Sequence, residues 1–202
     1  METVKQKLSD NSRRNKIYTT FLQSCDDGNA TIKDIIQMGY KLMRKEDLHH
    51  HFFGDYSLRT TAEHLAYYAL VNTKADKSVN SEHVLTAQEA TNIIALFEKR
   101  IADRIPVEYI THEADYCGHK FFVNEHVLVP RSIMSARFSD FLQEIQWENY
   151  RVLDLCTGSG CIGITLALLN PKIRVDLLDI SAEALQVANI NINKHGLRDR
   201  VN

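Results

Sequence analysis

The segment with the clearest structural signal in this chain reads Val152-Leu153-Asp154-Leu155-Cys156-Thr157-Gly158-Ser159-Gly160-Cys161-Ile162-Gly163. Apolar residues come before and after two closely spaced glycines, a pattern typical of a strand, a turn and the start of a helix. Gly158 and Gly160 lack a Cβ, so the backbone of the turn can approach a ligand closely. The following helix directs its free N–H groups toward the turn. The segment therefore predicts a nucleotide-binding loop in an α/β domain.

Two classes of nucleotide cofactor fit such a loop. The spacing of Gly158, Gly160 and Gly163 matches the G-x-G-x-x-G fingerprint of dinucleotide-binding enzymes. Asp154, at the end of the expected strand, would repel an anionic pyrophosphate but would attract the sulfonium and ammonium groups of S-adenosylmethionine. We therefore favour S-adenosylmethionine, and an NAD-dependent oxidoreductase is the alternative.

A second strand and helix are expected after the loop. Residues 174–180 are largely apolar and contain Asp179, about twenty residues past the glycine turn, where an acidic side chain accepts hydrogen bonds from ribose hydroxyls. Ser181 can cap the next helix, and Gly196 is a plausible helix stop. Residues 151–196 therefore predict a β-α-β-α arrangement.

Composition excludes several other classes of protein. The chain has 202 residues, of which 44% are hydrophobic and 25% are charged, as in ordinary globular proteins. A formal net charge of −2 gives no reason to expect direct nucleic-acid binding. There is no apolar run of membrane-spanning length and no secretory h-region in residues 1–16. We expect a cytoplasmic protein without a membrane partner, of unknown oligomeric state.

The cysteines and histidines do not form a recognisable metal site. The four cysteines show no C-x-x-C spacing and are typical of reduced cytosolic thiols. His49-His50-His51 are adjacent, so their side chains point in different directions, and no acid or cysteine stands at ligand spacing. We therefore expect no metal, and a solvated helix end is the better interpretation of the histidines.

The first hundred residues predict a separate helical domain. Three capping boxes precede apolar stripes of helical period: Thr31-x-x-Asp34, Thr60-x-x-Glu63 and Thr86-x-x-Glu89. Three amphipathic helices can bury one another's stripes, so we place a helical domain at residues 1–104.

A linker and the nucleotide-binding part follow. Within residues 105–131, the runs 116–123 and 126–129 predict the strands of a β-hairpin, with Asn124-Glu125 at its turn. Residues 132–202 then form the nucleotide-binding part. Its first helix is capped by Ser132 and has an apolar side composed of Met134, Phe138, Phe141, Leu142 and Ile145.

Five motifs then occur in order: Arg104-Ile105-Pro106, Tyr116-Cys117-Gly118, Val127-Leu128-Val129-Pro130-Arg131-Ser132, Asp154-Leu155-Cys156-Thr157-Gly158-Ser159-Gly160-Cys161 and Asp179-Ile180-Ser181. Together they resemble the PrmB/HemK family of protein-glutamine N5-methyltransferases, most closely the PrmB branch, which methylates a glutamine of ribosomal large-subunit protein three. The resemblance covers roughly residues 50–200, and the ordered set is more specific than the glycine loop alone. It implies a helical substrate-recognition domain, a β-hairpin linker and the first half of a Rossmann-like S-adenosylmethionine domain with an incomplete sheet.

The resemblance also implies a cofactor site. In the family, the segment matching residues 156–160 surrounds the methionine part of S-adenosylmethionine, and the acid matching Asp179 holds the ribose. The candidate cofactor-binding residues are Asp154, Cys156, Thr157, Gly158, Ser159, Gly160, Asp179 and Ile180. We assign no catalytic residue and no metal ligand.

Two departures from the family bear on activity. Ala136 stands where the family often has glutamate, and the family's Asn-Pro-Pro-Tyr motif, which follows its fourth strand, does not occur in residues 1–202. In the family that motif accepts the two N–H bonds of the substrate amide and so positions its nitrogen. We therefore expect an incomplete chain that is inactive alone, ends before the third strand and leaves Val152, Leu153 and Leu155 paired on one side only.

Two further readings remain open. One is a non-catalytic relic that still binds a ribosomal protein through its helical domain. The other is a DNA adenine methyltransferase, which shares the Asn-Pro-Pro-Tyr chemistry; the lack of a basic patch disfavours it.

Overall fold

The computed structural model describes residues 2–46, 48, 58–73, 80–138 and 150–202. These residues belong to two compact units, Met1–Thr111 and His112–Asn202. In the described part of the chain, no helix has the length and apolar character needed to cross a bilayer.

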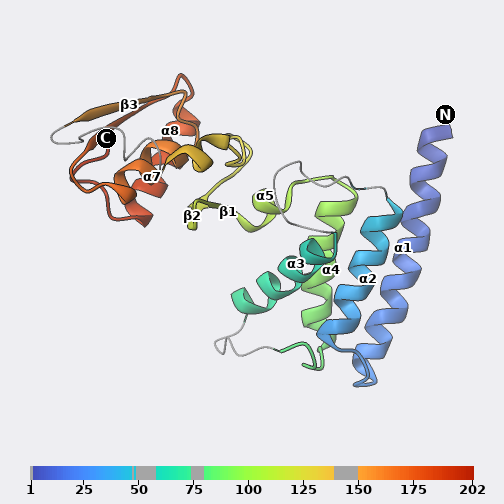
Figure 1. Ribbon diagram of the computed structural model, residues 1–202. Coiled ribbons are helices and arrows are strands. Elements are labelled where there is room, and N and C mark those ends of the chain that lie inside the picture. The colour runs from blue at the N-terminus through green and yellow to red at the C-terminus, as the bar shows by residue number, and fades with distance from the viewer. Residues whose placement is uncertain (1, 47, 49–57, 74–79, 139–149) are drawn as a thin grey trace. The chain divides into compact units, whose positions relative to one another are not determined.

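The first unit is helical. Its elements are α1 (Glu2–Asp26), α2 (Ile32–Lys45), α3 (Leu58–Thr73), α4 (Ala87–Ile101) and α5 (Val107–Thr111). Figure 1 shows α1 and α2 alongside α4, and α3 packs against both α2 and α4. Helices α2 and α4 approach closely at Gly39, where an added Cβ would lie 2.5 Å from the ring of Phe97. The expected apolar stripes meet in one core, which includes Ile32, Ile35, Met43, Leu65, Ile93 and Phe97.

Two of the three expected capping boxes are confirmed. The Thr31 hydroxyl accepts the Asp34 N–H at 3.4 Å, and the Asp34 carboxylate accepts the Thr31 N–H at 3.0 Å. Thr86 and Glu89 form the same reciprocal pair at the start of α4. The third box is wrong, because Thr60 lies within α3, which already includes Leu58 and Arg59.

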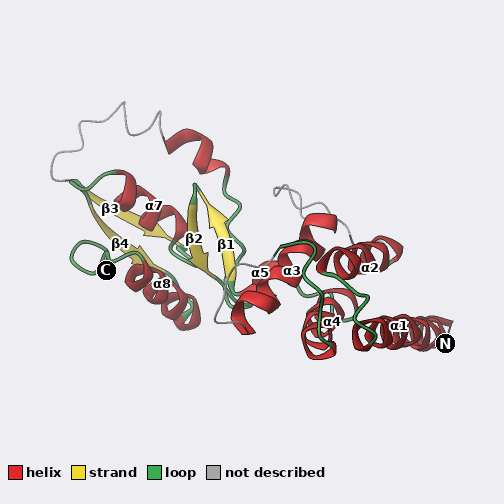
Figure 2. Cartoon of the chain, turned by 90° about the horizontal axis from the view of Figure 1, so that it is seen from below, coloured by secondary structure: helices red, strands yellow, loops and turns green. Residues whose placement is uncertain are grey.

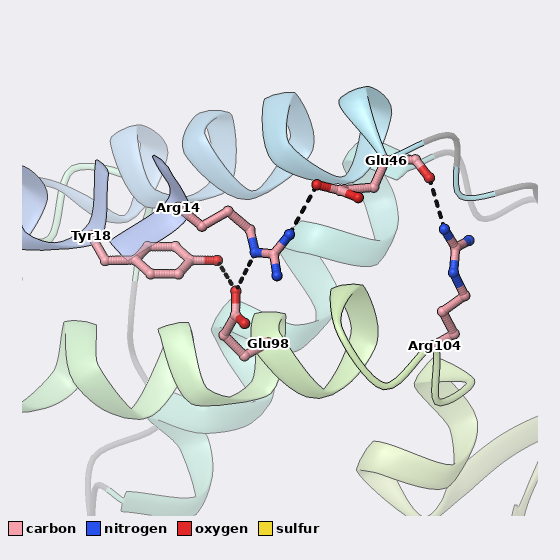
Figure 3. Close-up of polar contacts among 5 residues, drawn as sticks. All are labelled: Arg14, Tyr18, Glu46, Glu98 and Arg104. Carbon is pink, nitrogen blue, oxygen red and sulfur yellow. Dashed lines mark hydrogen bonds and ion pairs between the residues drawn. The ribbon is translucent and has the colours of Figure 1, made fainter. Parts of the chain in front are cut away.

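Helix α1 has no counterpart in the expectations from sequence, although Tyr18, Phe21, Leu22 and Cys25 stand at helical spacing and pack in the core of the first unit. A polar cluster also holds α1 against the other helices (Figure 3). Arg14, only 8% exposed, donates from Nε to Glu98 at 3.1 Å and from Nη1 to Glu46 at 3.0 Å. The Tyr18 hydroxyl donates to the same Glu98 oxygen at 2.6 Å. Burial and this hydrogen bond raise the pKa of Tyr18.

The same cluster extends to the end of α2. The Arg104 guanidinium donates to the Glu46 backbone carbonyl at 3.2 Å, as Figure 3 also shows. Glu46 is the C-terminal cap of α2, where unpaired carbonyls concentrate negative potential. Charged side chains thus connect α1, α2, α4 and the segment after α4 across the surface of one hydrophobic core.

The second unit begins with a β-hairpin. Its strands are β1 (Glu113–Tyr116) and β2 (His119–Phe122), paired antiparallel. Cys117 and Gly118 form the turn with φ values of 53° and 77°, as expected for a two-residue turn of type I′.

The strands of the expected hairpin are therefore at the wrong positions in the sequence. The run 116–123 contains the turn instead of a single strand, and residues 126–129 form no strand. Asn124 explains the difference, because its side-chain oxygen accepts the His126 N–H at 3.1 Å and its carbonyl accepts the Val127 N–H at 3.2 Å. These local bonds turn the chain after β2 and compete with a strand.

The expected helix after Ser132 is corrected in its described part. Residues Ile133–Arg137 form a 3-10 helix, η1, and Ser132 accepts the Met134 N–H at 3.3 Å. Met134 is exposed, whereas Phe138 is buried and packs edge-on against the Tyr116 ring. Phe141, Leu142 and Ile145 lie outside the described residues. Of the apolar side expected for this helix, Phe138 packs in the core of the second unit.

The segment predicted to bind a nucleotide has the element order expected for residues 151–196. It consists of β3 (Arg151–Leu155), α7 (Cys161–Leu169), β4 (Arg174–Leu178) and α8 (Ala182–Lys194). Strands β3 and β4 are parallel, with Val152 opposite Val175 and Asp154 opposite Leu177. Both strands contact α7, and α8 contacts β4 and β2. Figure 2 shows the two strand pairs, β1–β2 and β3–β4, as separate sheets.

The outer edge of β4 is also paired, contrary to expectation. Val175 donates its N–H to the Arg200 carbonyl at 2.9 Å, and Leu177 donates to Asn202 at 2.8 Å. A third parallel segment therefore starts within residues 200–202, because these backbone groups extend the ladder of β4. In the described residues, β3 pairs only with β4, and Leu153 and Leu155 are 57% and 61% exposed.

Candidate functional site

The glycine loop lies between the end of β3 and the start of α7, and it has an unusual backbone. Cys156, Gly158 and Gly160 all have positive φ, at 58°, 57° and 78°. The Thr157 N–H donates to the Leu178 carbonyl at 3.1 Å, which ties the loop to the end of β4. Cys156 is the only non-glycine of the three, and the left-handed region costs such a residue about 1–2 kcal/mol. The loop geometry is thus imposed by the surrounding structure.

Asp154 supports this loop from the strand. Its Oδ2 accepts the Thr157 hydroxyl at 2.7 Å and the Gly163 N–H at 3.0 Å. One carboxylate oxygen therefore joins the loop to the first turn of α7, where free N–H groups favour negative charge. Asp154 is thus more than a negative charge suited to a cation, because it also positions the loop.

Asp179 holds the loop from the neighbouring strand end. Its Oδ2 accepts the Gly158 N–H at 2.8 Å, and its Oδ1 accepts the Ser181 N–H at 3.0 Å. The Ser181 N–H, followed by the Gly158 N–H, lowers the pKa of Asp179 below its usual value. The side chain is therefore a carboxylate at neutral pH. Two acids from adjacent parallel strands converge on one glycine loop.

Gly158, Gly160 and Gly163 each lack a side chain for a different structural reason. An added Cβ at Gly158 would meet nothing within 4 Å, so this position faces open space. At Gly160 it would lie 2.8 Å from Ile164 and 3.1 Å from Leu177, and at Gly163 it would lie 2.5 Å from Leu177. Gly160 therefore lets the loop backbone approach core side chains of the protein itself. The expectation that it lets the backbone approach a ligand is corrected. Of the two loop glycines, only Gly158 leaves open space beside the backbone.

The other candidate residues differ in accessibility. Thr157 and Ser159 are buried, so their side chains support the loop from inside. Cys156 is exposed, and Ile180 is completely exposed beside Asp179. An isoleucine so placed offers apolar surface next to a carboxylate. The structure thus brings the predicted residues together around the loop, with the buried ones beneath it.

The cysteine at the start of α7 is not an activated nucleophile. Burial raises the pKa of the Cys161 thiol to about 11, so it is protonated at neutral pH. Burial also raises the pKa of Cys117. No group of three or more potential metal ligands occurs among the described residues, and His49-His50-His51 lie outside them.

Asn191 is a site-forming residue that the sequence argument does not identify. It lies on the buried side of α8 with Ala184, Val187 and Ala188, and it is fully buried. Its side chain contacts both the glycine loop and β2. A signal is present in the sequence, because Asn191 is a polar residue at helical spacing within an apolar stripe.

Comparisons with known proteins bear on this geometry. A family model described as a methyltransferase domain matches residues 147–202. The ribosomal protein uL3 glutamine methyltransferase of Burkholderia pseudomallei is 42% identical over 120 residues, which are 58% of this chain and 39% of that protein. The expected family resemblance is confirmed.

Two further relatives carry the same name. The protein from Neisseria meningitidis is 32% identical over 178 residues, covering 85% of this chain and 57% of the relative. The protein from Neisseria gonorrhoeae is 39% identical over 120 residues, covering 58% and 40%. The chain thus spans between about two fifths and three fifths of the length of these relatives, and its loop lies in the segment that matches the methyltransferase domain.

Proposed function

We propose that this chain carries the S-adenosylmethionine-binding part of a protein-glutamine methyltransferase that acts on a large-subunit ribosomal protein. The observation that carries the proposal is the convergence of Asp154 and Asp179 on the glycine loop. The match of residues 147–202 to a methyltransferase domain and the names of the relatives support the same reading.

The residues around the loop fit S-adenosylmethionine by their chemistry. Two carboxylates give the loop negative potential, which suits a sulfonium and an ammonium and opposes a pyrophosphate. The open position beside Gly158 leaves room for a ligand against the backbone. Ile180 provides exposed apolar surface beside Asp179, suitable for an aromatic base.

Each residue then has a distinct role in holding the cofactor. Asp179 would accept hydrogen bonds from the ribose hydroxyls through lone pairs that its two backbone donors leave available. Asp154, through Thr157, would fix the loop that surrounds the methionine part, with Cys156, Ser159 and Gly160. The bound cofactor supplies an electrophilic methyl group. We assign no catalytic residue within residues 1–202.

The fold supports the same assignment. We propose that β3, α7, β4, α8 and the paired residues 200–202 are the opening of a Rossmann-like sheet of the class I methyltransferase type. The helical unit, with its own core, would recognise the ribosomal protein. The hairpin would link the two.

Calorimetric titration of the chain with S-adenosylmethionine and, separately, with NAD tests the cofactor assignment. We expect binding of S-adenosylmethionine only, and at least about tenfold weaker binding in Asp179→Asn because a carboxylate accepts stronger hydrogen bonds than an amide. The matched control is Asp199→Asn, an exposed aspartate on the same unit. Binding of NAD without binding of S-adenosylmethionine would overturn the proposal.

Transfer of a labelled methyl group tests the substrate. The gene product that contains residues 1–202 is incubated with purified uL3 and S-adenosylmethionine labelled in its methyl group. We expect label on a glutamine side chain of uL3, located by mass spectrometry of peptides. Label on DNA and none on uL3 would contradict the assignment of a ribosomal substrate.

A further inference from the structure

The buried amide of Asn191 joins two parts of the second unit that lie far apart in sequence. Its Nδ2 donates to the Ser159 carbonyl in the glycine loop at 2.9 Å and to the Phe122 carbonyl of β2 at 2.9 Å. Its Oδ1 accepts the Phe122 N–H at 2.6 Å. The side chain is 0% exposed, so water does not compete for these bonds.

The three bonds require an amide at this position. Nδ2 uses both of its hydrogens on two carbonyls, and Oδ1 uses a lone pair on one N–H, so the orientation of the amide is determined by its partners. A carboxylate here would place an oxygen against two carbonyl oxygens. A leucine of similar size would remove the partner of three backbone groups, the N–H and the carbonyl of Phe122 and the buried carbonyl of Ser159.

The hairpin end of this connection is firmly anchored. Phe121, next to Phe122, is fully buried and packs against Tyr116, which in turn contacts Phe138. The loop end is different, since Ser159 stands between the two glycines with positive φ. The loop therefore depends on an external contact for its position, and the core of the hairpin provides one through Asn191.

We propose that Asn191 is a positioning residue that couples the glycine loop to the hairpin. It fixes the position of the Ser159 carbonyl relative to β2, so that binding of a ligand at the loop changes the mobility of Phe122. The inference rests on the proposed cofactor function and extends it. Because the hairpin follows the helical unit directly in sequence, the coupling gives cofactor binding a route toward the segment that leads to that unit.

Hydrogen exchange of single amides tests the coupling in the unmodified chain. We expect S-adenosylmethionine to slow exchange of the Phe122 N–H by about tenfold, because the Asn191 oxygen that accepts it becomes held more firmly. In Asn191→Leu and Asn191→Asp this ligand effect is lost, while hydrogen bonds between β1 and β2 stay protected. Without ligand, the Gly160 N–H, which donates to the Thr157 carbonyl at 2.9 Å, exchanges faster in both variants.

The affinity for S-adenosylmethionine is measured on the same proteins. We expect the dissociation constant for S-adenosylmethionine to rise about tenfold in the Asn191 variants and to stay unchanged in Asn189→Leu, an exposed asparagine on the same helix. The slower exchange of Phe122 in the unmodified chain needs no variant, so the test stands even if a variant unfolds. If the ligand binds and leaves Phe122 exchange unchanged, or if a folded Asn191 variant binds normally, the coupling is wrong. If the unmodified chain does not bind the ligand, the cofactor proposal fails, and the ligand-free exchange of Gly160 still decides whether Asn191 positions the loop.

Discussion

Replacing either loop glycine by alanine separates its role in folding from its role in binding. Gly158 and Gly160 both have positive φ, and they lie two residues apart in the same loop. An alanine at either position therefore has the same backbone cost. They differ in what the new methyl group meets, which is open space at Gly158 and the packed side chains of Ile164 and Leu177 at Gly160.

The magnitudes follow from these two terms. A left-handed backbone costs alanine about 1–2 kcal/mol, and the lower entropy of the unfolded chain offsets about 0.5 kcal/mol of it. Gly158→Ala should thus lower the free energy of unfolding by about 1 kcal/mol. At Gly160, crowding adds about 1–3 kcal/mol, because Ile164 and Leu177 are buried and have little room to move. Gly160→Ala should therefore lose about 3 kcal/mol.

Urea unfolding followed by circular dichroism measures the stability of each variant, and calorimetry measures its affinity for S-adenosylmethionine. We expect Gly158→Ala to remain folded and to bind at least about tenfold more weakly, because its methyl group occupies the open position beside the backbone. Gly160→Ala should show the larger loss of stability. Equal losses of stability, or normal binding by Gly158→Ala, would refute this account of the loop.

Three further predictions concern other parts of the chain. Arg14→Met should lower the free energy of unfolding by about 2 kcal/mol, since it leaves two partly buried glutamates without their cation, whereas the exposed neighbour in Arg13→Met should change it little; thermal unfolding of both measures this. The lowered pKa of Asp179 means that its carboxylate stabilises the fold above the ordinary aspartate pKa and that this contribution disappears as the pH falls through the lowered value. The stability difference between the unmodified chain and Asp179→Asn should therefore be constant near neutral pH and shrink under acid, and a difference that grows under acid would be inconsistent with the sign of the shift. Iodoacetamide at neutral pH should modify exposed Cys156 and leave buried Cys161 unmodified, as read by mass spectrometry of peptides.

The capping boxes at Thr31 and Thr86 and the strand, loop and helix around Gly158 could be predicted because each depends on residues within a few positions of one another. The two acids of the loop could be predicted for a different reason, since parallel strands end at the same edge of a sheet. The strands of the hairpin were predicted at the wrong positions, because two adjacent residues with positive φ, Cys117 and Gly118, make a tight turn that apolar alternation does not reveal.

Local patterns in the sequence by themselves determined the β-α-β-α segment, the helical character of the first unit and the position of the acids around the glycine loop. Only the tertiary structure decided that Arg14 connects α1 to α4, because its partner Glu98 is 84 residues away. It also decided that Asn191 supports the loop, through Phe122 at a separation of 69 residues. Buried polar contacts of this kind depend on the meeting of distant segments, and no short-range periodicity encodes which segments meet.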